Sequence, residues 1–290
     1  MERPGIEPEV TVTGAPGAKR KVRPADSPPQ PNYAAGNVLV CGRALCEAGT
    51  VTDRLDSEIA GEFLLTARSL AEYRAMFALG ADELRGRILD CPGGAASFAC
   101  EAAEFGAEVI AVDPCYAQPA GELRETALAD TDRGNAWSAA HAGLYSWDWY
   151  GGDPAVHRRM RHAAVRRFTA DLSEHPGRYV AAALPALPFS DNTFDLVLSS
   201  HLLFTYADRL NADFHLAALL ELARVSRGEV RLYPLLDHSG EDLAELVAWV
   251  RAELRARGVG SALRPTVAYE FQRGADRQLV LNPQPSVGVS

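Results

Sequence analysis

Residues 87–98 read Arg-Ile-Leu-Asp-Cys-Pro-Gly-Gly-Ala-Ala-Ser-Phe, and residues 108–113 read Glu-Val-Ile-Ala-Val-Asp. In the first stretch a short apolar strand runs into Gly93 and Gly94, where the absence of a Cβ atom allows a sharp turn. The second stretch predicts another strand. A strand, a glycine turn, a helix and a strand in this order are typical of a βαβ unit that binds a nucleotide.

The helix of this unit is expected over residues 95–105, and the strand after it ends at Asp113. Asp113 follows Asp90 by 23 residues, close to the interval at which such a unit delivers an acid to the ribose of a nucleotide. A dinucleotide-binding turn also has a third glycine, which is missing here. Instead Asp90 ends the first strand, where its charge repels a pyrophosphate but can hold the ammonium group at the amino-acid end of S-adenosylmethionine, directly or through water.

The stretch resembles motif I of the class I S-adenosylmethionine-dependent methyltransferases, acid-x-Gly-x-Gly, with Pro92 at the first glycine position and Ala96 at a common third one. Two later stretches resemble the family in the same order. Residues 186–201 are similar to its Leu-Pro-Phe, turn, Phe-Asp and apolar strand, and residues 221–232 to the helix and strand that follow. The resemblance covers about residues 69–281.

This resemblance implies an α/β fold with a Rossmann-like, mostly parallel seven-stranded sheet, helices on both faces and a C-terminal antiparallel hairpin. The sequence also predicts that hairpin, because strand-like residues 265–271 and 278–281 flank the turn at residues 273–276. A dinucleotide-binding Rossmann sheet usually lacks such a hairpin.

Capping patterns predict where three helices begin. Ser69-x-x-Glu72 and Ser239-x-x-Asp242 both have the spacing of a capping box. Asn211 can cap the helix between them.

Length and composition predict one sizeable domain with appendages. The 290 residues are 47% hydrophobic, enough to bury a full core. Residues 1–35 are rich in Pro and Gly and predict a disordered tail, which leaves residues 36–290 as the domain. Residues 117–177 form a longer segment than a βα crossover needs, so we expect an inserted lid there.

Charge and apolar patterning exclude several classes of partner. The formal net charge of −9 argues against nucleic acid, which binds through Lys and Arg. No long apolar run predicts a membrane span or a secretion signal, so a cytoplasmic location is expected. Cys41 and Cys46 lack a second pair for zinc, and no metal site is predicted.

The resemblance assigns the cofactor S-adenosylmethionine, with S-adenosylhomocysteine as product, to the turn and the strand ends. Asp113 is expected to bind both ribose hydroxyls, with Tyr116 stacking on adenine and Leu184 giving it an apolar contact. Arg68 and Tyr73 can reach the cofactor's carboxylate, although a surface position for Arg68 and packing for Tyr73 are the alternatives. The predicted cofactor residues are Arg68, Tyr73, Asp90, Gly93, Gly94, Asp113, Tyr116, Leu184 and Ser200.

Aromatic residues crowd the inserted segment. Tyr145, Trp147, Trp149 and Tyr150 are expected to form the substrate-facing lid, and packing of an extra helical layer is the alternative. The basic stretch at residues 157–168 can attract an anionic substrate, but a solvated helix face is the favoured interpretation.

Methyl transfer proceeds by in-line displacement, and holding the two reactants in a dry pocket supplies much of the acceleration. On the resemblance His201, at the end of the fourth strand, is the best-placed candidate base, and Tyr206 is a weaker one. A wall position or a core histidine is the alternative for His201. The expected acceptor is a small molecule, whose identity the sequence does not give.

Three other classes stay open. One is a non-catalytic nucleotide-binding relative that acts as a binding or interaction protein. A nicotinamide-dependent oxidoreductase shares the βαβ start, but the missing glycine and the terminal hairpin count against it. A nucleic-acid methyltransferase is disfavoured by the charge and by the lack of an Asn/Asp-Pro-Pro-Tyr/Phe tetrad after the fourth strand.

Overall fold

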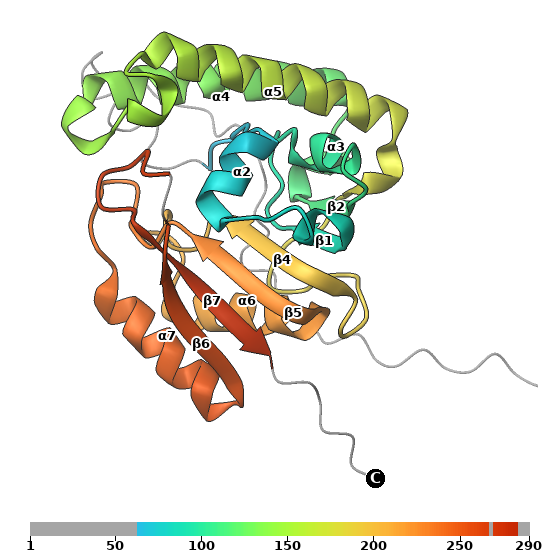
Figure 1. The fold of residues 1–290 in the computed structure, drawn as a ribbon, viewed down its shortest axis with the longest axis vertical. Coiled ribbons are helices and arrows are strands. Elements are labelled where there is room, and N and C mark those ends of the chain that lie inside the picture. Colours follow the sequence, from blue (N-terminus) through green and yellow to red (C-terminus); the bar gives the residue numbers. More distant parts are fainter. Residues whose placement is uncertain (1–62, 267–268, 284–290) are drawn as a thin grey trace, which may run out of the picture. The chain divides into compact units, whose positions relative to one another are not determined.

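The computed structural model describes residues 63–266 and 269–283. The tail expected over residues 1–35 lies outside the described residues. Within them the strands form one seven-stranded sheet in the order β3-β2-β1-β4-β5-β7-β6 (Figure 1). The strands are β1 Arg87–Asp90, β2 Glu108–Val112, β3 Tyr179–Val180, β4 Phe194–Ser200, β5 Ser226–Tyr233, β6 Val259–Pro265 and β7 Arg277–Pro283.

The sheet is mostly parallel. β1 pairs in parallel with β2 and β4, and the outer pairs β2–β3 and β4–β5 are parallel too. β7 runs antiparallel to both β5 and β6. This topology confirms the predicted fold class. The strand order reverses between β1 and β4, and in open α/β sheets ligands bind beyond the carboxyl ends of the strands at such a switch point.

Two helical layers cover the sheet, because side chains alternate between its faces along each strand. Ile88, Leu196 and Leu198 pack in one cluster with α2 to α5, whereas Leu89 and Val197 pack in the other with α6 and α7. The α-helices are α2 Leu70–Phe77, α3 Phe98–Ala103, α4 Ala120–Ala140, α5 Pro154–Glu174, α6 Ala212–Val225 and α7 Ala244–Ala256. The 3₁₀ helices are η1 Glu83–Arg85, η2 Pro114–Ala117, η3 Ala142–Leu144, η4 Asp148–Tyr150 and η5 Pro176–Arg178.

Two of the three predicted caps are present. Ser69 and Glu72 form the reciprocal capping box of α2, and the Asn211 side chain accepts from the Phe214 amide at the start of α6. The third cap is wrong, because α7 begins at Ala244 without a side-chain cap.

Two predicted boundaries also differ. The helix after the glycine turn begins at Phe98, not at residue 95, because the backbone of Gly94 is left-handed and the Ala95 amide donates to the Thr66 carbonyl (2.9 Å). The first strand of the terminal hairpin is β6, not residues 265–271. Tyr269 and Phe271 are instead buried in the α2–α5 cluster.

The long segment between β2 and β3 contains α4 and α5, which lie side by side along one face of the domain (Figure 1). α5 also contacts α3, so the pair is attached to the layer that carries the glycine turn.

Candidate functional site

The glycine turn follows β1 and is held closely by its neighbours. A Cβ atom on Gly93 would lie 2.5 Å from the Tyr116 hydroxyl and 2.8 Å from the Ala111 Cβ. Gly94 has a φ of +53°, and a Cβ there would lie 2.7 Å from the Thr66 carbonyl oxygen. Glycine is therefore required at both positions by close approach, and at Gly94 by conformation as well.

Asp113 follows β2 and faces this turn. Its Oδ2 accepts from the Gly94 amide (3.1 Å) and its Oδ1 from the Cys115 amide (3.0 Å). Burial raises the pKa of Asp113, and these two hydrogen bonds oppose the rise. The Tyr116 hydroxyl donates to the Gly94 carbonyl (2.7 Å), and its ring packs edge-to-face on Tyr179. The acid and the aromatic residue expected at the nucleotide therefore both lie against the turn.

Asp90, at the end of β1, is paired with Tyr73. The Tyr73 hydroxyl lies 3.0 Å from each carboxylate oxygen, and its ring stacks on Phe98 at a centroid distance of 4.3 Å. Burial raises the pKa of Asp90, and the bond from Tyr73 opposes that rise. Tyr73 thus combines the packing role with a contact to the predicted cofactor residue.

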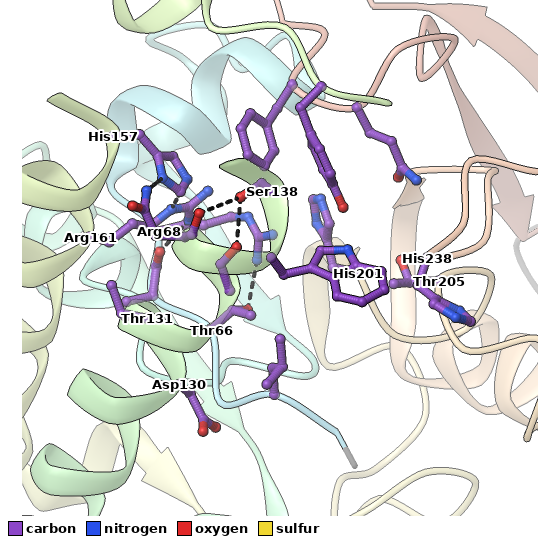
Figure 2. A pocket seen from close by; sticks show the side chains of 18 of the residues that line it. Thr66, Arg68, Asp130, Thr131, Ser138, His157, Arg161, His201, Thr205 and His238 are labelled. Atoms are coloured by element: carbon purple, nitrogen blue, oxygen red, sulfur yellow. Dashed lines mark hydrogen bonds between the residues drawn. The ribbon is translucent and has the colours of Figure 1, made fainter. Parts of the chain in front are cut away.

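The structure also contains a cavity of about 130 Å³, lined in part by His201, which we call the His201 cavity. Its walls come from residues 64–68, from α4 and α5, from the loops after β4 and β5, and from residues 271–272. In the view of Figure 2, Arg68, Arg161 and His157 lie on one side of it and His201 on the other. The cavity is therefore beyond the carboxyl ends of β4 and β5, where α/β sheets bind ligands.

Buried polar atoms without a partner gather at this cavity. Within the described residues eight buried side-chain polar atoms have no hydrogen-bond partner, and five of them belong to residues that line the cavity. The five are Arg68 Nε, Thr131 Oγ1, His201 Nδ1, Thr205 Oγ1 and His238 Nδ1. Because buried polar groups are nearly always hydrogen-bonded to protein, water or ligand, this concentration makes the cavity the candidate ligand site.

Both predicted catalytic candidates line the cavity. His201 directly follows β4 with a φ of +52°, and its amide donates to the Tyr233 carbonyl (2.8 Å). Burial, and then the charges of Arg68 and Arg161, hold the pKa of His201 well below its usual value, so its ring is neutral at neutral pH. The Tyr206 hydroxyl accepts from the Leu64 amide (3.0 Å).

The four predicted lid residues do not lie together at the cavity. Tyr145 lines the cavity, but Tyr150 is only 2% exposed and donates to Glu72 in the core (2.8 Å). Trp147 and Trp149 are partly buried and pack against the α2–α5 cluster, outside the cavity wall. Tyr150 thus lies in the core, as the packing alternative expects, and its role at the substrate stays a prediction.

The favoured interpretation of the basic stretch on α5 was a solvated helix face, but the stretch is only partly exposed. His157 and Arg161 are buried in the cavity wall. Arg161 forms an ion pair with Glu72 (2.9 Å) and donates from Nε to His157 Nε2 (3.0 Å). Burial, and then the Arg161 charge, lower the pKa of His157 to about 2, so this histidine is neutral.

The remaining predicted cofactor residues lie outside the cavity wall. Leu184 is buried in the α6–α7 cluster, and Ser200 is buried at the end of β4. The sequence analysis missed Thr131, Thr205 and His238. A signal for the first was present, because Thr131, Asn135 and Ser138 follow at helical spacing and form one polar face of α4.

Within residues 63–266 and 269–283, no helix combines the length and apolar character of a membrane span. The same residues contain no group of three or more His, Cys, Asp or Glu side chains that could hold a metal ion.

Known proteins resemble the chain at several levels. Residues 134–233 match the methyltransferase domain family. An uncharacterized protein of Methanocaldococcus jannaschii is 28% identical over 219 residues, which cover 75% of this chain and 95% of that protein.

Two solved structures also show similarity. One is the 1,6-didemethyltoxoflavin-N1-methyltransferase of Burkholderia thailandensis, 16% identical, covering 73% of this chain and 76% of that one at a TM-score of 0.40. The other is the magnesium protoporphyrin IX methyltransferase of Synechocystis, 14% identical, covering 79% and 78% at a TM-score of 0.37.

The family match begins within α4 and ends at β5, so it does not include the glycine turn. The turn with Asp90 and Asp113 resembles the family's first motif, and the sheet is seven-stranded and mostly parallel with a C-terminal antiparallel pair, as the resemblance implied. Together the match to the methyltransferase domain family, the motif and the sheet support the resemblance to the class I S-adenosylmethionine-dependent methyltransferases.

Proposed function

We propose that this methyltransferase transfers the methyl group to a small-molecule acceptor bound in the His201 cavity. The observation that carries the proposal is the gathering of five unpartnered buried polar atoms around about 130 Å³ of space. An apolar cavity of about 150 Å³ holds a benzene molecule. A cavity of this size favours an acceptor with on the order of ten non-hydrogen atoms over a polymer.

The cofactor is proposed to lie over the glycine turn. Asp113 would bind the ribose hydroxyls by exchanging its bonds to the Gly94 and Cys115 amides for bonds to the ligand. Tyr116 and the apolar Leu184 are the proposed adenine contacts. The amino-acid end would lie near the Asp90–Tyr73 pair, and Ser200 beside the sulfonium.

In-line displacement requires that acceptor and methyl donor be held together away from water. The buried walls of the cavity supply that exclusion. If the acceptor must lose a proton, the unpartnered Nδ1 of neutral His201 is the proposed acceptor of that proton, although the lowered pKa of this ring makes it a weak base. Tyr206 is the second candidate for this role.

One observation favours the alternative of a relative that binds the cofactor without turnover. Both Asp113 oxygens accept from backbone amides, and the Asp90 carboxylate already accepts the one hydrogen of the Tyr73 hydroxyl. Carboxylates that are already hydrogen-bonded within the protein do not need a ligand, so they are also compatible with a purely structural βα turn.

Calorimetry and product analysis test the proposal. We expect saturable heat with S-adenosylmethionine and S-adenosylhomocysteine and none with NADPH. Asp113→Ala should weaken cofactor binding by about 1.5–3 kcal/mol, the contribution of a hydrogen bond to a charged group. Incubation of a metabolite extract with methyl-labelled cofactor, followed by mass analysis, should give a labelled small product. Binding without any labelled product would support the binding-only alternative, and binding of NADPH alone would exclude both.

A further inference from the structure

Arg68 is the least satisfied charged group of the cavity wall. Its side chain is 6% exposed, and its Nε has no hydrogen-bond partner. Across the described residues its guanidinium makes one hydrogen bond, from Nη1 to Thr66 Oγ1 (2.8 Å), and forms no ion pair. A guanidinium carries five N–H donors and is always charged, so most of this donor capacity is unused.

The other charges around the cavity are already paired. Arg161 is neutralised by Glu72 at 2.9 Å. Asp130, the acid in the wall, pairs with Arg133 (2.6 Å) and also accepts from a backbone amide. Arg68 therefore leaves the cavity with an uncompensated positive charge.

The two buried histidines of the wall do not change this balance, because burial and the nearby arginines keep His157 and His201 neutral. His238 Nδ1 lies 3.8 Å from an Asp208 carboxylate oxygen. An uncompensated buried cation is costly, and the fold retains it where an anion completes the site.

Rings form the apolar part of the same wall. Trp137, Tyr145, Tyr206 and Phe271 all line the cavity. Trp137 also stacks on His141 at a centroid distance of 3.8 Å, and Tyr145 contacts Phe271 at 4.9 Å, which holds both rings in place. Walls of this kind favour a flat apolar body beside the charged group.

We propose that the acceptor is a small ring-bearing carboxylic acid of about the size of benzoate, whose carboxylate is bound by Arg68. This inference rests on the proposed function and names the substrate class of the same cavity. Arg68 Nε and Nη2 supply a planar pair of donors that matches a carboxylate. The hydroxyls of Thr131 and Thr205 offer further polar contacts in the wall.

A second carboxylate is present in the system, that of the cofactor's methionine moiety. The cavity wall includes Arg68 but neither Asp90, Gly93 nor Asp113, the residues proposed to lie along the cofactor. We therefore assign Arg68 to the acceptor, and the test below separates the two sources.

The probes are benzoate and its neutral isostere benzamide, titrated by calorimetry into the full chain saturated with S-adenosylhomocysteine. Wild type should bind benzoate at least about tenfold more tightly than benzamide, the effect of one charge-assisted hydrogen bond. Arg68→Gln should lose that preference and Arg68→Lys should keep part of it. The matched control Arg74→Gln removes an exposed charge from α2 and should behave as wild type.

Cofactor binding is measured in parallel with S-adenosylhomocysteine and with 5′-deoxy-5′-methylthioadenosine, which lacks the amino acid. On our assignment Arg68→Gln binds both within about twofold of wild type. A tenfold loss for S-adenosylhomocysteine alone would assign Arg68 to the cofactor and overturn the inference. Equal wild-type affinity for benzoate and benzamide would also overturn it, and that comparison needs no variant. Absence of any cofactor binding by wild type would instead contradict the proposed function.

Discussion

The glycine turn and the His201 cavity lie at the same edge of the sheet, yet the protein satisfies their polar atoms to different extents. At the turn, each oxygen of Asp113 accepts from a backbone amide, and the two oxygens of Asp90 share the single hydrogen of the Tyr73 hydroxyl. In the cavity, five buried polar atoms have no hydrogen-bond partner among the described residues. The first region is held by its own contacts, and the second has unused polar atoms that, in our proposal, a ligand would partner.

This difference has an energetic meaning. A buried polar group without a partner costs about 1–3 kcal/mol. The turn avoids that cost, so its shape does not depend on what it binds. The cavity retains the cost, and a ligand that supplies partners recovers it on binding. Four changes break or sharpen this contrast.

The largest expected effect comes from leaving a buried charge unpaired in the helical layer of α2 to α5. Glu72 is 0% exposed and holds Arg161 (2.9 Å), the Tyr150 hydroxyl (2.8 Å) and the Ser69 amide (2.8 Å). Glu72→Ala leaves the Arg161 charge buried alone and should lower the free energy of unfolding by about 3–5 kcal/mol. Urea denaturation measures it.

The control for this change is Asp82→Ala, which removes an exposed ion pair with Arg85. Surface pairs contribute little, so this variant should unfold as wild type does. Equal unfolding curves for the two variants would contradict the assignment of Glu72 to a buried pair.

The next change acts on the turn itself. Gly94→Ala places a Cβ atom 2.7 Å from the Thr66 carbonyl at a φ of +53°. A left-handed alanine and the forced contact together should lower the free energy of unfolding by about 2–4 kcal/mol. Gly106→Ala is matched, because its φ is +94° but nothing lies within 4 Å. It should lose only about 1–2 kcal/mol, and an equal loss would show that the turn is not tightly held.

Local patterns in the sequence predicted the parts of the fold that depend on neighbouring residues. The turn at Gly93 and Gly94 was predicted from apolar strands and glycines within 30 residues of each other. The capping box at Ser69 and Glu72 was confirmed for the same reason. Such patterns report on one turn of helix or one strand pair, which the chain forms from adjacent residues.

Long-range partners account for what the sequence could not give. Glu72 is both a capping residue and the counter-charge of Arg161, 89 residues later, and the second role leaves no local pattern. The predicted cap of α7 at Ser239 was wrong because the Ser239 and Glu241 amides both donate to the Asp237 side chain, which forms a turn before the helix. The hairpin strand was misplaced because Tyr269 and Phe271, strand-like by composition, are used in the core.

The third change concerns the neutral histidine of the cavity wall. His157 has a pKa of about 2 when folded and 6.5 as its ordinary value. Below pH 6.5 the unfolded chain takes up a proton that the folded chain does not, so stability is lost as pH falls from 6.5 towards 2. The slope from this group is about 1.4 kcal/mol per pH unit. His157→Gln should remove that slope between pH 6 and 4.5 and leave the slope above pH 7 unchanged. Parallel wild-type and variant curves at acid pH would contradict the neutral buried ring.

The smallest expected effect is that of Arg68→Met. It is compared with Arg161→Met, which changes the other buried arginine of the cavity wall. Arg161→Met removes one member of a pair and leaves the Glu72 charge buried, so the protein should be destabilised by about 3–5 kcal/mol. Arg68→Met removes a charge that has no carboxylate within ion-pair distance among the described residues, at the loss of one bond to Thr66. Its free energy of unfolding should stay within about 1 kcal/mol of wild type, because relief of the buried charge offsets the lost bond. Denaturation of both variants without added ligand measures the difference. A loss for Arg68→Met as large as that for Arg161→Met would mean that the cavity, like the turn, is satisfied by the chain itself.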